Sequence, residues 1–414
     1  MPFLYSVAVG AYHLGVRIAA LWKPKAKAWV QGREDLWERL SSKRDALRGC
    51  LWMHCASVGE FEQGRPVLEA IKAQRPDLPV LLTFFSPSGY EARKDYALAT
   101  HVDYLPADSA SNAQRLVELV APRAAIFVKY EFWYHHLHAL KAKGVPTFLV
   151  SAIFRDGQPF FKWYGGAWRT MLGSYARIFT QDGASKDLLA GIGVTNVTVS
   201  GDTRFDRVMA IVEAGSRSAF TVHFKAATRD PVLICGSTWP QDEQLLSAVP
   251  LSVRLVIVPH EVTEVHVRSI LKRFDPEPML VEEYEERIMA TGQGNWPRLL
   301  VDRTGLLAGL YGAGDIAYVG GGFGDGIHSL LEAAAWGKPV IFGPKHTKFA
   351  EAKGLIDAGG GFEVRNAEEL RAVLDRLLGD KAALAKASEV AAKYVRDRVG
   401  ATERTVGEVL ARMV

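Results

Sequence analysis

The sequence predicts an α/β protein of two doubly wound domains, each a parallel sheet covered by helices on both faces. Short apolar runs rich in β-branched and aromatic residues alternate with helical stretches along most of the 414-residue chain. These runs form two series of similar length, separated by residues 204–230, which contain no convincing strand. A chain of this length also exceeds the size at which one hydrophobic core usually stops growing.

The expected strands divide at this linker. The first series comprises residues 51–55, 79–84, 102–105, 124–129, 146–150, 177–180 and 197–200. The second comprises residues 231–235, 254–258, 278–281, 298–302, 315–319 and 339–342, and the tail after residue 366 reads as helices only. We therefore expect an N-terminal helix over 1–22, a first domain over 23–205 and a second domain over 206–414. The C-terminal helices are expected to form the end of the second domain.

The N-terminal segment, residues 2–22, is apolar and interrupted only by His13 and Arg17. Its length is borderline for spanning a bilayer, which needs about 20 apolar residues. Residues 1–48 carry a net charge of +5, against +4 for the whole chain. We expect an anchor that lies in or dips into an anionic membrane surface. The alternative is a helix packed on its own domain, and the near-neutral remainder implies no general affinity for nucleic acid.

Neither a metal nor an organic cofactor is expected. Cys50, Cys55 and Cys235 have no Cys-x-x-Cys spacing and read as reduced, buried thiols. The sequence also has no Asp-x-Asp and no His-x-x-x-His pair with a third ligand at sensible spacing.

Loops at the carboxyl ends of strands are the places where a doubly wound fold binds ligands. In the first domain, HCASVGEFEQGRP (54–66) places Ser57 and Gly59 in a turn and Glu60 near a helix N-terminus. The helix dipole favours a negative charge there, so Glu60 is poised to accept a proton. Ser57 lacks the Gly-x-Ser-x-Gly elbow of a nucleophile and reads as a cap or turn residue. Glu131, in IFVKYEFWYHHL, is the second candidate catalytic residue; it either orients a substrate or loop or pairs with a nearby cation.

The second domain offers three further loops. LICGSTWPQDE places Gly236, Ser237 and Thr238 at a strand end, where hydroxyls and free amides can hold a phosphate, and VIVPHE ends at Pro259 and His260. The third, IAYVGGGFGDGIHSLLEAAAWGKPVIFGP, has five glycines, Gly324 and Gly326 among them, before a helix expected to begin with His328 and Ser329 and to carry Glu332. The absence of Gly-x-Gly-x-x-Gly and of a Walker motif argues against a dinucleotide or ATP.

These motifs together resemble a known family. HCASVGEFEQ, VKYEFW, GDTRFD, CGSTWPQDE, VPHE, TGLLAGLYGAGDIAYVGGGF and GIHSLLEAAAWGKPVIFGP stand in the order and near the spacing seen in the Kdo transferases of lipopolysaccharide biosynthesis. The resemblance implies a GT-B glycosyltransferase with two Rossmann-like domains that needs no metal. It also implies inverting transfer of Kdo from CMP-Kdo to a lipid A precursor, at the cytoplasmic side of the inner membrane.

The resemblance also assigns site residues. Glu60 is the general base, and the CMP contacts are Pro259, His260, Gly305, Leu306, Leu307, Ser329, Leu330, Leu331 and Glu332. The family often has Asn at position 329 and Gly-Glu-Leu at 305–307, changes that backbone contacts survive. Arg204 or Lys345 could supply positive charge to the phosphate. The alternatives are a GT-B transferase or epimerase acting on a UDP-sugar, and a membrane-bound binding protein without catalysis.

An aromatic and basic stretch, IFRDGQPFFKWYGGAWR (153–169), completes the predictions for a lipid acceptor. We expect its aromatic side chains, Phe160, Phe161, Trp163 and Trp168, to meet acyl chains. Its basic side chains, Arg155, Lys162 and Arg169, are expected to meet phosphates. The alternative is an amphipathic helix packed on its own sheet.

Overall fold

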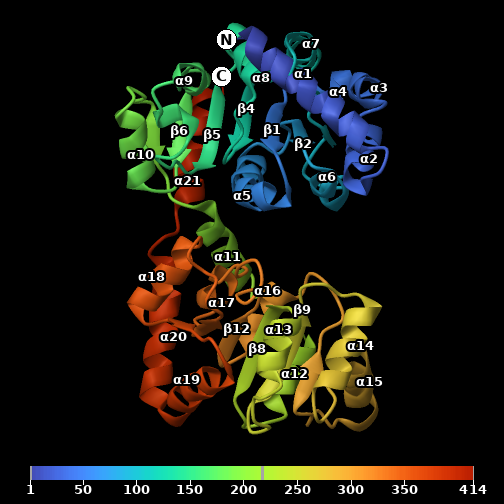
Figure 1. The fold of residues 1–414 in the computed structure, drawn as a ribbon, viewed down its shortest axis with the longest axis vertical. Coiled ribbons are helices and arrows are strands. Elements are labelled where there is room, and N and C mark those ends of the chain that lie inside the picture. The colour runs from blue at the N-terminus through green and yellow to red at the C-terminus, as the bar shows by residue number, and fades with distance from the viewer. Residues whose placement is uncertain (1, 216–218, 414) are drawn as a thin grey trace. The chain divides into compact units, whose positions relative to one another are not determined.

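The computed structural model describes residues 2–215 and 219–413 and confirms a doubly wound α/β fold in each of two units (Figure 1). The first unit holds residues 1–207 and 399–414, and the second holds residues 208–398. The sequence predicts a boundary two residues earlier and a C-terminus that belongs wholly to the second domain. The segment from residue 399 onward instead packs on the first unit, which corrects that end of the second domain.

The first unit contains a seven-stranded parallel sheet in the order β3-β2-β1-β4-β5-β6-β7. Its strands are β1 (Leu51–Cys55), β2 (Val80–Phe84), β3 (His101–Tyr104), β4 (Ala124–Val128), β5 (Thr147–Ala152), β6 (Arg177–Thr180) and β7 (Val197–Val199). Leu51 of β1 pairs with Val80 of β2 on one side and with Ala124 of β4 on the other. The strand order therefore reverses between β1 and β4, which is the topological switch point of this sheet.

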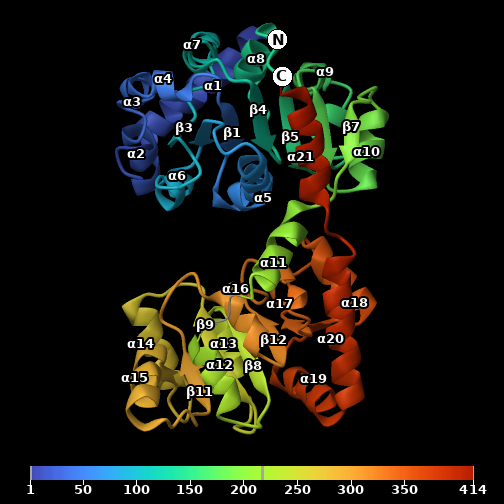
Figure 2. The same ribbon diagram turned by 180° about the vertical axis from the view of Figure 1, so that it is seen from behind.

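Helices cover both faces of this sheet. They are α1 (Pro2–Ala19), α2 (Pro24–Gln31), α3 (Leu36–Ser42), α4 (Arg44–Leu47), α5 (Val58–Gln74), α6 (Pro87–Arg93), α7 (Ala110–Val120), α8 (Tyr134–Ala142), η1 (Pro159–Phe161), α9 (Gly166–Leu172), α10 (Gly183–Ala190) and α21 (Ala401–Arg412). Alternate residues of β1 serve the two faces: Leu51 and Met53 pack with α5 and α21, whereas Trp52 packs with α3, α7 and α8. Figure 2 shows α5 and α21 on the near side of the sheet. Burial on both faces explains why the strands read as continuous apolar runs.

The second unit repeats this architecture. Its sheet has the order β10-β11-β9-β8-β12-β13-β14, with the switch point between β8 and β12. The strands are β8 (Val232–Thr238), β9 (Arg254–Pro259), β10 (Met279–Leu280), β11 (Arg298–Leu300), β12 (Ile316–Val319), β13 (Val340–Phe342) and β14 (Gly361–Glu363). Each strand expected from the sequence is present, and β14 is the addition that the sequence analysis missed.

The helices of the second unit pack on both faces of its sheet. They are α11 (Thr203–Glu213), which begins in the first unit, α12 (Ala219–Ala226), α13 (Pro240–Leu246), α14 (Glu264–Arg273), α15 (Val281–Thr291), α16 (Leu307–Leu310), η2 (Tyr311–Ala313), α17 (Leu331–Ala335), α18 (Ala350–Ala358), α19 (Ala367–Gly379) and α20 (Lys381–Arg396). One core joins the sheet to α13, α14, α19 and α20. The predicted linker holds α11 and α12 and, in its described residues, no strand.

Helix α1 packs on the first unit along one side only. Tyr5 donates its hydroxyl to Asp108 across 2.5 Å, and Ser6 Oγ bonds to Nε2 of His135 at 2.8 Å. Six of its large apolar side chains are exposed, namely Phe3, Leu4, Val7, Tyr12, Leu14 and Ile18. Within residues 2–215 and 219–413, no single helix is long and apolar enough to cross a membrane, although α1 and α2 pass that test as a pair bent by 117°.

The three cysteines are buried and free. Burial raises the pKa of Cys50 to about 12 and the pKa values of Cys55 and Cys235 well above the ordinary thiol range. They are therefore protonated, unreactive core residues, as the sequence predicted.

Candidate functional site

Most of the site residues predicted from the sequence lie at the carboxyl ends of the two sheets, near their switch points. In the first unit, Ser57, Gly59 and Glu60 follow β1, and Glu131 follows β4. In the second unit, Gly236, Ser237 and Thr238 end β8, and the glycine-rich loop follows β12. Each sheet thus brings two candidate loops to the place where a doubly wound fold binds its ligand.

Glu60 lies in the first turn of α5, as predicted. Ser57 occupies the N-cap position with an extended backbone, but its hydroxyl donates to the Glu60 carboxylate instead of capping a backbone amide. Gly59 has open space on its side-chain side, where an added Cβ would meet only Ser57 Oγ, at 3.7 Å. Glu60 is half-buried and, among the residues that the structure describes, forms no ion pair. It is available to accept a proton.

Glu62 has a different environment, although it is only two residues away. Its carboxylate contacts Arg93 at 2.8 Å, Arg207 at 3.7 Å and Arg65 at 3.8 Å. Three guanidinium groups therefore surround Glu62, and Arg93 donates a hydrogen bond to its carboxylate, so Glu62 is a poorer candidate for the base than Glu60. The two residues point in different directions on α5, as 3.6 residues per turn requires.

Glu131 is buried in a hydrogen-bond network behind β4. One carboxylate oxygen contacts Nε2 of His54 at 3.0 Å and accepts the indole N–H of Trp133 at 2.5 Å. Nδ1 of His54 lies 3.0 Å from both oxygens of Thr83, the hydroxyl and the backbone carbonyl. Tyr175 donates its hydroxyl to the backbone carbonyl of Glu131. These contacts engage one oxygen of the Glu131 carboxylate with His54 and Trp133, so its surroundings match the alternative of pairing with a neighbouring side chain, and the orienting role stays a prediction.

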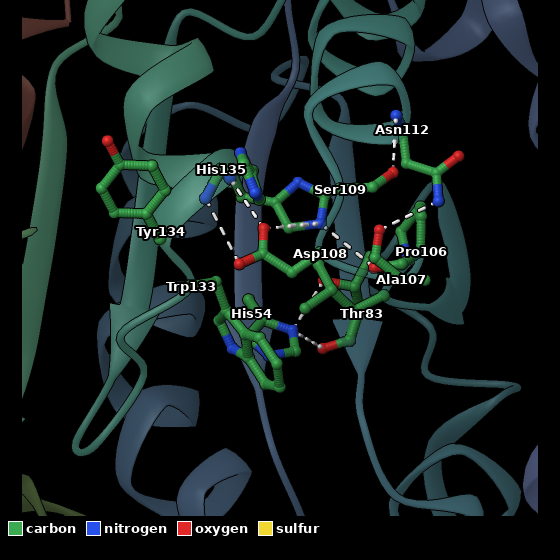
Figure 3. Close-up of polar contacts among 12 residues, drawn as sticks. His54, Thr83, Pro106, Ala107, Asp108, Ser109, Asn112, Trp133, Tyr134 and His135 are labelled. Atoms are coloured by element: carbon green, nitrogen blue, oxygen red, sulfur yellow. Dashed lines mark hydrogen bonds and ion pairs between the residues drawn. The ribbon is translucent and has the colours of Figure 1, made fainter. Parts of the chain in front are cut away.

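A second buried carboxylate, Asp108, stands beside this network (Figure 3). It accepts hydrogen bonds from the backbone amides of His135, at 3.3 Å, and His136, at 2.9 Å, at the start of α8. The first-turn amides of a helix lack intrahelical partners, so Asp108 satisfies two of them. Since Tyr5 of α1 donates to the same carboxylate, Asp108 joins the N-terminal helix to the segment that carries Glu131 and Trp133.

The loops on the two sides of the second switch point are joined by Asp242. Its carboxylate accepts from the amides of Trp239 and Gly321, both at 2.9 Å, and from the Tyr318 hydroxyl at 2.7 Å. Asp242 is buried in the first turn of α13. The sequence analysis missed this residue, although an Asp three positions after a helix-starting residue is a recognisable capping signal.

Trp239, His260 and His328 form an aromatic cluster at this edge. The His260 ring stacks on Trp239, with centroids 4.9 Å apart, and on His328, at 4.2 Å. The Trp239 indole donates to Nε2 of His328 at 3.1 Å. Pro259 ends β9, and the amide of His260 donates to the carbonyl of Thr238. The structure thus brings together residues from all three loops that the sequence singled out.

Most amides of the glycine-rich loop bond within the protein. The amides of Gly324 and Gly326 donate to Gly321 O, and the amide of His328 donates to Gly320 O. A Cβ on Gly321 would lie 2.4 Å from Gly326 O, and Gly326 itself has a φ of +140°. These glycines are therefore required by the close packing of the loop on itself.

The helix after this loop begins later than predicted. The helix α17 starts at Leu331, and His328, Ser329 and Leu330 precede it in irregular structure. The reason is that the loop folds back, with the amide of Ile327 bonded to Lys345 O. Glu332 still lies in the first turn, as expected.

Gly236 and the 305–307 segment meet through Tyr311. A Cβ on Gly236 would clash with the Tyr311 hydroxyl and with Leu307, so only glycine fits there. Burial raises the pKa of Tyr311 far above its ordinary range, and the carboxylate of Glu332 raises it further. Gly305, at a φ of +83°, and Leu306 precede the short helix α16.

The two candidate cations have different surroundings. Arg204 lies in the first unit, where its guanidinium bonds to Asp202 at 2.8 Å and 2.9 Å. Lys345 lies beside the glycine-rich loop, and its amide donates to Gly322 O. Its side chain is exposed, so Lys345 can meet an anion at that loop.

The aromatic stretch 153–169 is only partly exposed. Phe160 is buried in the core under the sheet, so the predicted contact of this side chain with acyl chains is wrong, and Phe161 is half-buried and packs against that core. Arg169 bonds to the carbonyls of Phe160 and Lys162. Trp163, by contrast, is 93% exposed. The two phenylalanines pack on the sheet instead of facing solvent, because burying a large apolar side chain is favourable.

Within residues 2–215 and 219–413, no group of three or more His, Cys, Asp or Glu side chains is arranged to hold a metal ion.

Comparison with known proteins identifies the family to which this chain is similar. A family model described as 3-deoxy-D-manno-octulosonic-acid transferase (kdotransferase) matches residues 34–207. A 3-deoxy-D-manno-octulosonic acid transferase of Bordetella pertussis is 29% identical over 433 residues, which cover 96% of this chain and 97% of that protein. The protein of the same name from Aquifex aeolicus is 30% identical over 344 residues, covering 81% of this chain and 87% of that protein.

Solved structures share the fold at low sequence identity. The crystal structure of UDP-GlcNAc 2-epimerase from Neisseria meningitidis bound to UDP-GlcNAc matches with a TM-score of 0.59, at 16% identity, over 87% of this chain and 99% of that chain. At this identity the likeness concerns the fold.

Proposed function

Because the chain belongs to the family of 3-deoxy-D-manno-octulosonic acid (Kdo) transferases, glycosyltransferases of lipopolysaccharide synthesis, we propose that it moves Kdo from CMP-Kdo to a lipid A precursor, with inversion and without a metal. The observation that carries the catalytic part of this proposal is the position of Glu60. It is a half-buried carboxylate with no cationic partner among the described residues, at the switch point of the first sheet.

Glu60 acts as the general base of the transfer. Its carboxylate takes the proton of the acceptor hydroxyl while the hydroxyl oxygen forms a bond to the anomeric carbon of Kdo. The bond between that carbon and the phosphate oxygen breaks, and CMP leaves with the bonding electron pair. One base is sufficient for this single displacement, and Ser57, which donates to Glu60, holds the carboxylate in place.

The second unit binds the donor. We assign the nucleotide to the carboxyl edge of its sheet, where His260, the 305–307 segment and the start of α17 meet the glycine-rich loop. Glu332 accepts hydrogen bonds from the ribose hydroxyls, and Lys345 offsets charge on the phosphate. A single phosphate needs less neutralisation than a diphosphate, which suits a site where Lys345 supplies positive charge.

We further propose that the enzyme works at the cytoplasmic side of the inner membrane, and the exposed apolar side of α1 supports this proposal. The exposed apolar side chains of α1 enter the interface, and the basic residues after the helix, Lys23, Lys25 and Lys27, meet anionic headgroups. Trp163 adds a second aromatic contact with the bilayer surface.

Mass spectrometry of the reaction product tests the proposal. The protein is incubated with a lipid A precursor and with CMP-Kdo generated in situ, and the product should gain the mass of one or more Kdo residues. Calorimetric titration with CMP and with UDP separates the proposal from the alternative of a UDP-sugar enzyme: we expect CMP to bind more tightly. Absence of any product, or preference for UDP, would contradict the proposal.

A further inference from the structure

Lys129 has an unusual backbone conformation beside the proposed base. It follows β4 directly, so it faces the loop of Glu60 across the switch point between β1 and β4. Its φ is +73°, a left-handed value that non-glycine residues rarely adopt. The amide of Lys129 donates to the carbonyl of Val150 at 2.9 Å, which holds this conformation. Backbone strain of this kind persists where the fold overdetermines it, and it clusters at ligand sites.

The side chain of Lys129 is held without an acidic partner. It is half-buried, and its ammonium lies 5.4 Å from the ring centroid of Tyr130. In the described part of the chain, no carboxylate lies within ion-pair distance of Lys129. A cation at the carboxyl edge of the sheet that has no counter-charge from the described chain is available to bind an anion from outside.

A second unpaired cation lies near the same tyrosine. Burial raises the pKa of the Tyr130 phenol, Arg155 lowers it, and Glu60 and Asp182 raise it. Because β1, β4 and β5 are neighbours in the sheet, the loops that carry Glu60, Tyr130 and Arg155 lie side by side at its carboxyl edge. The guanidinium of Arg155 is exposed and forms no ion pair with any described residue.

The nearby acids are already engaged elsewhere. Asp182 caps α10 by accepting the amide of Ser185 at 2.7 Å, and Glu60 accepts the hydroxyl of Ser57. Neither carboxylate pairs with Lys129 or Arg155. The loops after β1, β4 and β5 thus present a base and two positive charges around one exposed aromatic ring.

We propose that Lys129 and Arg155 form an anion subsite beside Glu60 that binds a carboxylate or phosphate group of a substrate. This inference rests on the proposed function, in which two groups have that chemistry: the carboxylate of the transferred sugar acid and a phosphate of the lipid acceptor. A sugar carboxylate bound here brings the anomeric carbon toward Glu60. An acceptor phosphate bound here brings the reacting hydroxyl toward it.

Lys129→Met tests the subsite, because it keeps the length of the side chain and removes the charge. We expect kcat/KM to fall by about 10-fold to 100-fold, the effect of losing a charge-assisted hydrogen bond. Lys129→Arg should recover most of the activity. Lys186→Met, which changes an exposed lysine on α10 of the same unit, is the matched control and should match the parent.

Lys129→Gly separates binding from folding. Glycine adopts a φ of +73° without strain, so this variant should melt no lower than Lys129→Met. If the side chain binds an anion, Lys129→Gly is nevertheless as inactive as Lys129→Met. An active Lys129→Gly, or a Lys129→Met within threefold of the parent, would overturn the proposal. A parent protein that transfers no Kdo would instead refute the proposed function.

The source of the anion is identified with two acceptors, one carrying phosphate groups and one enzymatically dephosphorylated. If the sugar carboxylate binds here, Lys129→Met raises KM for the donor, and the defect persists with the dephosphorylated acceptor. If an acceptor phosphate binds here, KM for the acceptor rises, and the defect disappears when that phosphate is removed.

Discussion

The indole of Trp239 donates a hydrogen bond to Nε2 of His328 across 3.1 Å. Because an indole N–H can only donate, Nε2 must be the accepting nitrogen, and the proton of the neutral imidazole is on Nδ1. Burial and the neighbouring His260 lower the pKa of His328 to about 4. A neutral histidine in one defined tautomer therefore stands at the start of the segment assigned to the nucleotide.

Trp239→Phe should remove the hydrogen bond that fixes this tautomer of His328. The phenyl ring keeps an aromatic contact with His260 but cannot donate, so protonation of Nε2 no longer breaks a hydrogen bond. We expect the pKa of His328 to rise toward its ordinary 6.5, as measured by NMR titration of labelled histidine. Trp163→Phe, in the first unit, is the control. An unchanged titration of His328 in Trp239→Phe would show that burial and His260 set its pKa without the indole.

The same histidine predicts a dependence of stability on pH. Between its unfolded pKa of 6.5 and its folded value of about 4, the unfolded chain binds a proton at this residue that the folded chain does not. The free energy of unfolding of the second unit should therefore fall as pH decreases through this window, and the contribution is fully present above it. Urea unfolding between pH 7 and pH 4 measures the slope, which should be shallower in His328→Gln. Equal slopes would contradict the assignment.

Glu60→Gln should abolish most of the transfer. Glutamine keeps the size of the side chain and can still accept from Ser57, but it cannot take a proton. We expect a loss of roughly 10² to 10⁴-fold in kcat with CMP affinity nearly unchanged. The matched control is Glu62→Gln, which weakens contacts with Arg93 and Arg207 and should cost stability but little activity.

Glu131→Gln should behave as a structural change. The amide keeps an acceptor for Trp133 but loses the charge that faces His54, so we expect a loss of about 1.5 to 3 kcal/mol in the free energy of unfolding. Transfer measured well below the melting temperature should fall less than in Glu60→Gln. If Glu131→Gln melted like the parent and lost as much transfer as Glu60→Gln, Glu131 would be the base.

The exposed side of α1 should control membrane binding. Replacing Leu4, Leu14 and Ile18 by serine removes apolar side chains that are 67%, 60% and 49% exposed, so the fold should be unaffected. Sedimentation with anionic vesicles should show reduced binding of this variant. Tyr5→Phe is the complementary control: it removes the bond to Asp108, lowers the melting temperature and leaves vesicle binding intact. Undiminished binding of the serine variant would contradict the membrane proposal.

Most of the fold could be predicted because strands buried on both faces leave an unmistakable pattern. β1 and β4 consist of buried residues throughout, and each reads as an apolar run followed by a turn. β14 lacks that pattern: it has three residues, begins with glycine and ends with a half-buried Glu363. The position of α21 was equally unpredictable, because an amphipathic helix does not specify which sheet its apolar side covers.

The candidate site was predictable where one loop determines it. Glu60 follows from a strand, a turn and a helix start within ten residues. The partners of Glu131 were not predictable, because His54 and Glu131 are 77 residues apart and meet only through the pairing of β1 with β4. The role of Asp242 was hidden for the same reason, since Gly321 lies on another strand end.

The placement of α21 has a consequence for synthesis on the ribosome. Val406 and Val409 complete the core that α5 and β1 build, yet the 191 residues of the second unit, 208–398, are translated in between. At about 5 to 20 residues per second, the groove that receives α21 stays uncovered for roughly 10 to 40 seconds on each nascent chain. During that interval the first unit presents an apolar surface to the cytosol, and chaperone binding at this stage should be released only when the last helix emerges.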